Sequence, residues 1–226
     1  MAKTKKFKSF VKNNMEQKKL EEAKKKSDVF KKRTRLLSLA SLLIVGVLLL
    51  MMLVNFASVY NTNVGTEVKI SGFNCVAAGL SGNYTSSDAS YGDIAVPFNY
   101  YAASQTHTLC TVSIVVLFVI VAHIVVALFA VITNKQGVFN FLTIALGLAE
   151  GVLFIVCYAV ARSMKDAEIL SGYCNNNPAC SIESTAILPA LLAIFSLALP
   201  ILAIIMTQKH KAEMQAAPAP QVKSVK

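Results

Sequence analysis

Charged side chains are scarce through most of this 226-residue sequence. Four long apolar stretches contain no lysine, arginine or aspartate: residues 36–60, 109–133, 138–161 and 184–206. Each is long enough to cross a bilayer, because about 20 helical residues at about 1.5 Å each span about 30 Å of hydrocarbon. The charged residues are concentrated outside these stretches, whereas a soluble domain would spread them along the sequence, so an ordinary soluble domain is excluded. We therefore predict an all-α integral membrane protein with four transmembrane helices in an antiparallel bundle.

Sequence signatures of enzymes and of cofactor sites are also missing. There is no H-E-x-x-H, P-loop, G-x-S-x-G or dinucleotide glycine pattern. His107 does not stand in a metal-ligand spacing, and the basic residues lack the motifs of nucleic-acid binding. We expect no enzymatic activity, cofactor, metal or nucleic-acid partner. A lipid-modifying membrane enzyme is the remaining enzymatic alternative.

Lysine and arginine are almost absent from two segments, and this asymmetry predicts the orientation. Nineteen of the 22 lie in residues 1–35, in the turn 134–137 or in the tail 207–226. The loops 61–108 and 162–183 contain only the other three, Lys69, Arg162 and Lys165. The positive-inside rule then predicts a multi-pass protein of the cell membrane with both termini cytoplasmic and two outer loops. The first apolar stretch is long and leads into three more, so we expect a signal anchor rather than a cleaved signal peptide.

Residues 1–35 contain no glycine or proline and are predicted to form a basic, amphipathic cytoplasmic helix. Phe7, Phe10 and Val11 share one face of it, and charge comes from nearby lysines, including Lys5, Lys8 and Lys12. Such a segment suits the surface of an anionic inner leaflet, at about 1 kcal/mol per basic residue. The alternative is a solvated arm that only sets topology. The proline-containing tail 207–226 is predicted to be disordered.

The first outer loop, residues 61–108, is long for a connector without structure of its own. It holds five of the ten glycines and six tyrosine or phenylalanine residues, and Val68–Phe73 has the composition of a strand. We expect a small extracellular, β-containing cap. Its aromatic residues either contact a partner or form the cap's own core or an interfacial belt. Asn83 begins an Asn-Tyr-Thr glycosylation sequon on the outer side.

Four of the five cysteines fall in the outer loops or at the outer end of a span. Four cysteines allow three pairings. We favour Cys174 with Cys180, which closes a tight loop, and Cys75 with Cys110, which ties the long loop to the second span. The alternative is that all of them stay reduced. The fifth, Cys157, lies inside the third span.

The two middle spans each carry one ionisable side chain at mid-membrane depth, His123 and Glu150. An ionised carboxylate there costs at least about 2.5 kcal/mol, so Glu150 is expected to be protonated, paired or facing a cavity. The four-residue turn makes the spans antiparallel neighbours, and His123 is the natural partner. The pair either locks the helices through a hydrogen bond worth about 0.6–2 kcal/mol, or relays a proton or binds a cation.

Small residues and prolines predict further features of the spans. Gly147 and Gly151 form a G-x-x-x-G pattern on the face of Glu150, which permits close helix approach. In the fourth span, Pro189 and Pro200 each remove a helical hydrogen bond and predict kinks, either static or acting as a hinge. The first span is nearly all aliphatic and is predicted to be a lipid-facing anchor.

The loop plan resembles the general shape of claudin-type tetraspans, with a long first outer loop, a tiny inner turn and a shorter second outer loop. The chain has no tryptophan, so it lacks their G-L-W-C-C-like signature, and it lacks the tetraspanin C-C-G motif. The resemblance is one of topology alone. We expect an accessory subunit or scaffold that assembles with other membrane proteins or with itself. The alternative is a small oligomeric channel or proton-coupled transporter that uses Glu150 and His123.

Overall fold

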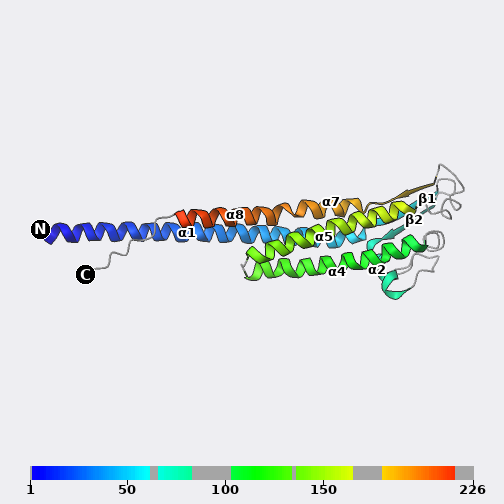
Figure 1. Ribbon diagram of the computed structural model, residues 1–226, viewed down its shortest axis with the longest axis horizontal. Coiled ribbons are helices and arrows are strands. Elements are labelled where there is room, and N and C mark those ends of the chain that lie inside the picture. Colours follow the sequence, from blue (N-terminus) through cyan, green and yellow to red (C-terminus); the bar gives the residue numbers. More distant parts are fainter. Residues whose placement is uncertain (1, 62–65, 83–102, 134–135, 165–179, 217–226) are drawn as a thin grey trace.

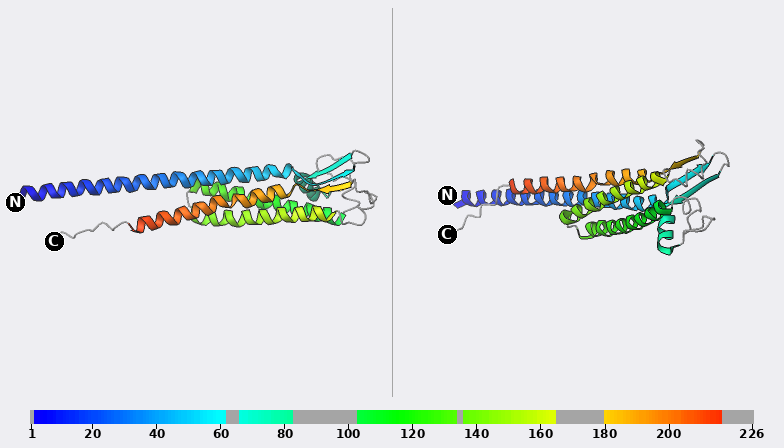
Figure 2. Two further views of the ribbon diagram at one scale, coloured as in Figure 1. Left: turned by 90° about the horizontal axis from the view of Figure 1, so that it is seen from above. Right: turned by 45° about the vertical axis from the view of Figure 1, so that its right-hand side comes forward.

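The computed structural model describes residues 2–61, 66–82, 103–133, 136–164 and 180–216 (Figure 1). Most of this described chain is helical, and four helices in it are long and apolar enough to cross a membrane. The four run side by side, and a small sheet lies at one end of them (Figures 1 and 2). Helix α1 (Ala2–Leu50) begins and helix α8 (Ala198–Ala216) ends at the end opposite the sheet.

Helix α1, Ala2–Leu50, is a single helix of 49 residues. The predicted basic helix and the first apolar stretch are therefore one continuous element. The helix was predicted to reach Tyr60, and that boundary is wrong. A 3-10 turn at Met51–Leu53 ends the helical path, and strand β1, Asn55–Asn61, follows. Residues beyond Leu53 find backbone partners in neighbouring strands, so they do not need helical hydrogen bonds.

The sheet has the order β2-β1-β3, with β2 at Thr66–Ser71 and β3 at Cys180–Glu183. Both outer strands pair antiparallel with β1, so the two predicted outer loops join in one sheet. The sequence anticipated β2 in part, but it did not indicate helix α2, Gly72–Ser81, which follows directly. Ser71 caps α2 by accepting a hydrogen bond from the Asn74 backbone N–H at 3.2 Å. Gly82 ends it at φ +69°, a conformation that favours glycine.

Helices α4, Ala103–Thr133, and α5, Gln136–Ser163, form the central pair. Helix α2 lies across the sheet end of α4 (Figure 2). Helix α1 contacts α4, and helices α7 (Ile187–Ser196) and α8 (Ala198–Ala216) contact α5.

The fourth apolar stretch forms two helices, α7 at Ile187–Ser196 and α8 at Ala198–Ala216. The break at Leu197 has its cause in Pro200, which has no backbone N–H and whose ring would clash with the carbonyl of Ser196 four residues earlier. Pro189 causes no break, because it lies in the first turn of α7, where no helical donor is required. The predicted disordered tail is also wrong in part, since α8 continues through residues 207–216.

Helix α1 has an inward face, which corrects the expectation that its apolar stretch only faces lipid. Thr34, Ser38 and Ser41 are buried on that face, followed by Val45 and Leu48. The Thr34 hydroxyl donates to the Phe30 carbonyl oxygen at 3.0 Å, and the Ser38 hydroxyl donates to that of Thr34 at 3.2 Å. Small polar side chains that bond to their own helix permit close packing of α1 on its neighbours.

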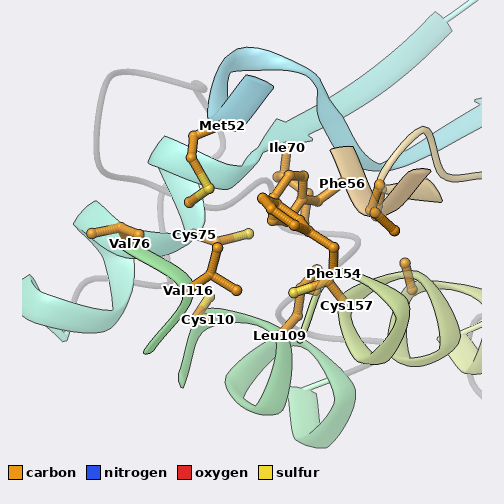
Figure 3. Packing of buried hydrophobic residues seen from close by; sticks show 14 of the residues in the cluster. Met52, Phe56, Ile70, Cys75, Val76, Leu109, Cys110, Val116, Phe154 and Cys157 are labelled. Carbon is orange, nitrogen blue, oxygen red and sulfur yellow. The ribbon is translucent and has the colours of Figure 1, made fainter. Parts of the chain in front are cut away.

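The large buried side chains gather at the sheet end of the helices, as Figure 3 shows. The rings of Phe56 from β1 and Phe154 from α5 meet edge to face, with centroids 6.0 Å apart. Gly72 allows this arrangement, because a Cβ there would lie 2.6 Å from the Phe56 ring. Sheet, α2 and helices therefore share one apolar core, which we call the sheet half of the packing.

Candidate functional site

The side chains of His123 and Glu150 meet between α4 and α5. The His123 Nδ1 and Glu150 Oε1 atoms are 2.9 Å apart, and both side chains are 0% exposed. The short connection between the helices sets this register. His123 lies ten residues before the end of α4, and Glu150 lies fourteen residues after the start of α5, so the two positions agree in depth to about one helical turn.

The hydrogen bond of this pair has two arrangements. A neutral or protonated imidazole donates its Nδ1–H to an ionised carboxylate, whereas a protonated carboxyl donates its O–H to a bare Nδ1. His123 Nε2 and Glu150 Oε2 are buried and have no hydrogen-bond partner among the described residues. One ring nitrogen and one carboxyl oxygen of the pair are therefore free to exchange a proton with a small polar molecule such as water.

The pair is enclosed by α5 and the α7–α8 break. A Cβ on Gly147 would lie 2.8 Å from Leu197 Cδ2, 3.5 Å from Ser196 Oγ and 3.7 Å from His123 Cε1. The Ser196 hydroxyl donates to the Ala193 carbonyl oxygen at 2.6 Å. Glycine at this position lets the break approach the imidazole closely.

A small cavity lies about two helical turns nearer the chain termini than the pair. Its volume is about 10 Å³, about the space that one water molecule occupies. Ser38 and Ser41 of α1, Asn140 and Thr143 of α5, and Pro200 of α8 are among the residues that line it. Ser41 Oγ is buried and has no partner in the described part of the chain. The helix interior on this side is therefore small and polar, and we call it the terminal half.

The G-x-x-x-G face of α5 packs inside the chain. A Cβ on Gly151 would lie 3.3 Å from Ile194 Cγ1 and 3.9 Å from Ala193 Cβ, both on α7. Gly147 is equally enclosed, as described above. The close helix approach that these glycines permit is therefore made between α5 and α7.

The predicted Cys75–Cys110 disulfide is wrong, because both cysteines are free thiols, as is Cys157. All three are buried in the sheet half (Figure 3), where they pack as small apolar side chains. The hydrogen bond with Cys110, together with burial, raises the pKa of the Cys75 thiol well above its usual range. Cys75 is therefore a protonated, unreactive thiol.

Several predicted site residues lie outside the described part of the chain. Asn83 and Cys174 are among them, and Cys180 is described only as the first residue of β3. The residues predicted to touch the membrane surface belong to the path of α1, but their side chains are not described: Phe7, Phe10, Val11, Lys5, Lys8 and Lys12. Within the described residues, no group of three or more His, Cys, Asp or Glu side chains is placed to hold a metal.

Sequence reasoning missed the polar residues that accompany the pair, chiefly Ser41, Asn140 and Ser196. The signal for Ser41 was available, because Thr34, Ser38 and Ser41 recur at helical spacing on one face of an otherwise aliphatic stretch. The arrangement as a whole can hold one proton between two side chains beside a water-sized cavity. Comparisons of the chain with protein-family models, curated protein sequences and solved structures found no match.

Proposed function

We propose that this chain is a multi-pass cell-membrane protein that acts without catalysis, as an accessory subunit or scaffold. Large apolar side chains on the outer faces of all four long helices support membrane insertion. Leu43, Phe118, Phe141 and Phe195 are 72%, 69%, 64% and 75% exposed. Exposed apolar surface of this extent requires a lipid or protein environment.

The distribution of lysine and arginine supports the orientation in this proposal. The sheet and α2 belong to the segments poor in these residues, whereas α1 begins and α8 ends at the basic end. The positive-inside rule then assigns both termini to the cytoplasm and the sheet to an extracellular cap.

The length of α1 carries the proposal of assembly. Its 49 residues correspond to about 73 Å, against about 30 Å for the hydrocarbon core. Figure 1 shows that α1 continues past the end of α8, beyond every other helix. An uninterrupted helix of this kind connects the membrane-spanning part to a cytoplasmic partner without a hinge.

The polar pair and the glycines of α5 already make contacts inside the chain, so a partner is expected to bind at the ends of the molecule. Glu150 binds His123, and Gly147 and Gly151 pack on the α7 and α8 region. None of these groups is available to a partner helix in this conformation. The accessible elements are the protruding part of α1 and the cap, and we assign assembly to them.

The test is purification of the intact chain in mild detergent beside a variant that lacks residues 2–16. This deletion removes the far end of α1 but keeps nine of the fourteen lysines and arginines that precede Leu36, so the orientation signal remains. We expect the intact chain to migrate in a defined larger complex and the shortened chain to lose a partner that mass spectrometry identifies.

Glu150→Gln is the matched comparison, because it changes the interior and leaves α1 intact. It is expected to keep the complex. Single particles of one four-span protomer without any bound protein, from wild type and deletion alike, would rule out assembly through α1.

A second function, proton-coupled transport, is favoured by one observation. Among the described residues His123 Nε2 and Glu150 Oε2 lack partners, and a water-sized cavity lies about two helical turns away. Proton exchange with the cytoplasmic side through this cavity is the step these residues can perform. Proton flux into liposomes that is the same for wild type and Glu150→Gln would eliminate this function.

A further inference from the structure

A groove between α1 and α8 lies just beyond the apolar part of both helices. Its volume is about 720 Å³, which is within the range of small-molecule sites, about 300–1,000 Å³. Val29, Phe30 and Met206 form an apolar lining. The rings of Phe30 and His210 stack with centroids 4.2 Å apart, and this contact joins the two helices at the groove.

The groove is rich in cations. Lys25, Lys26 and Arg33 of α1 and Lys209 of α8 line it, and all four are exposed. Two acids, Glu22 and Glu213, line it as well, so the side chains excluding His210 carry a net charge of +2. Cations from two helices around an apolar lining suit a ligand with both anionic and hydrocarbon parts.

The depth of the groove indicates a lipid. Arg33 precedes the first apolar residue of the span, Leu36, by three positions, which is about 4.5 Å of helix. The polar zone of a bilayer extends about 5–8 Å beyond the hydrocarbon, so Arg33 lies at the depth of lipid phosphates. Lys25 and Lys26 lie about 10–12 Å further along the axis. Cations spread over this range of depths match a headgroup with phosphates at more than one depth.

We propose that this groove binds a phospholipid whose headgroup carries more than one phosphate. The glycerol-linked phosphate contacts Arg33 at the membrane surface, and the outer phosphates reach Lys26 and Lys209. The apolar lining receives the upper part of the lipid. This inference rests on the proposed function only in requiring membrane insertion, and it does not require a protein partner.

The test uses the full chain in phosphatidylcholine nanodiscs with a small fraction of fluorescent phosphatidylinositol bisphosphate. The groove pair, Arg33→Gln with Lys209→Gln, is compared with Lys31→Gln with Lys211→Gln. The control residues are two positions away on the same helices, carry the same charge and do not line the groove. We expect lipid binding to weaken at least about tenfold in the groove pair and less than about twofold in the control.

Further variants and ligands in the same binding experiment distinguish a specific lipid site from the alternatives. The charge-preserving exchange Arg33→Lys with Lys209→Arg is expected to retain most binding. Equal losses in the groove and control pairs would show that only diffuse surface charge attracts the lipid, and would overturn the proposal. Equal affinity for phosphatidylserine would show that the groove does not select a headgroup with several phosphates. Equal affinity for soluble inositol trisphosphate would show that the ligand need not be a lipid. Either result would overturn the proposal.

The outcome is distinguishable from failure of the proposed function. A chain that does not enter nanodiscs contradicts both. Normal insertion with no difference between the two pairs contradicts only the lipid site, and deletion of residues 2–16 leaves every groove residue in place.

Discussion

The two halves of the helix packing are built from different side chains. The sheet half contains large apolar residues such as Met52, Phe56 and Phe154. The terminal half contains Ser38, Ser41, Asn140 and other small or polar residues around a cavity of about 10 Å³.

The proposed membrane location gives a physical reason for this difference. In lipid, helices gain no hydrophobic driving force by associating, so small residues and interhelical hydrogen bonds hold them together. In the proposed orientation, the strands and α2 of the sheet half lie outside the hydrocarbon. Burial of large apolar side chains there displaces water and is favourable. We therefore expect the sheet half to supply most of the stability and the terminal half to fix the positions of the helices.

Phe154→Ala is expected to have the largest effect, because it removes a ring from the centre of the sheet half and breaks the edge-to-face contact with Phe56. We expect a loss of about 3 kcal/mol in the free energy of unfolding, measured in bicelles. Phe118→Ala is the control, since that side chain is 69% exposed on α4. It should change stability by less than about 0.5 kcal/mol. Similar losses in both would mean that the sheet half is not a packed core.

The His123–Glu150 pair is expected to give the next largest effect, within the terminal half. A double-mutant cycle with His123→Ala and Glu150→Ala should give a coupling free energy of about 0.6–2 kcal/mol, because each single change leaves the other buried group unpaired. The measurement is the unfolding free energy of the wild type, both single variants and the double variant. Strictly additive losses would contradict the hydrogen bond at 2.9 Å.

Alanine substitutions at two glycines compare a close helix contact with an open position. Gly147→Ala places a methyl group 2.8 Å from Leu197 Cδ2, so the leucine side chain must move. We expect a loss of about 1 kcal/mol, at the low end for overpacking because that atom ends a flexible side chain. Gly46→Ala meets nothing within 4 Å and should be neutral or stabilising by up to about 1 kcal/mol. Thermal unfolding of both variants in one detergent makes the comparison, and an equal response would show that α5 does not approach the α7–α8 break closely.

The sequence predicted the four long apolar helices because length and lack of charge are local properties. It also predicted that His123 and Glu150 share a depth, because a four-residue turn leaves little freedom in register. The strand β1 was missed, since its residues continue an apolar stretch and its partners lie in segments far along the chain. Pairing of that kind depends on tertiary structure.

The cysteines show a second limit. Cys75 and Cys110 were predicted to be paired because both fall near an outer surface in the sequence. The unexpected helix α2 instead carries Cys75 into the sheet half, where it is buried beside Cys110 as a thiol. The pairing was predicted without helix α2, which no local pattern revealed.

Ser41→Ala is expected to have the smallest effect and the opposite sign. The Ser41 hydroxyl is buried without a partner among the described residues, whereas the Ser38 hydroxyl donates to the Thr34 carbonyl oxygen. Removing an unsatisfied buried hydroxyl and gaining helix propensity should raise the unfolding free energy by up to about 1 kcal/mol. Ser38→Ala, on the same face, should leave it within about 0.5 kcal/mol of wild type. If Ser41→Ala is destabilising instead, the hydroxyl has a partner in the cavity, and a water molecule there would stabilise the terminal half.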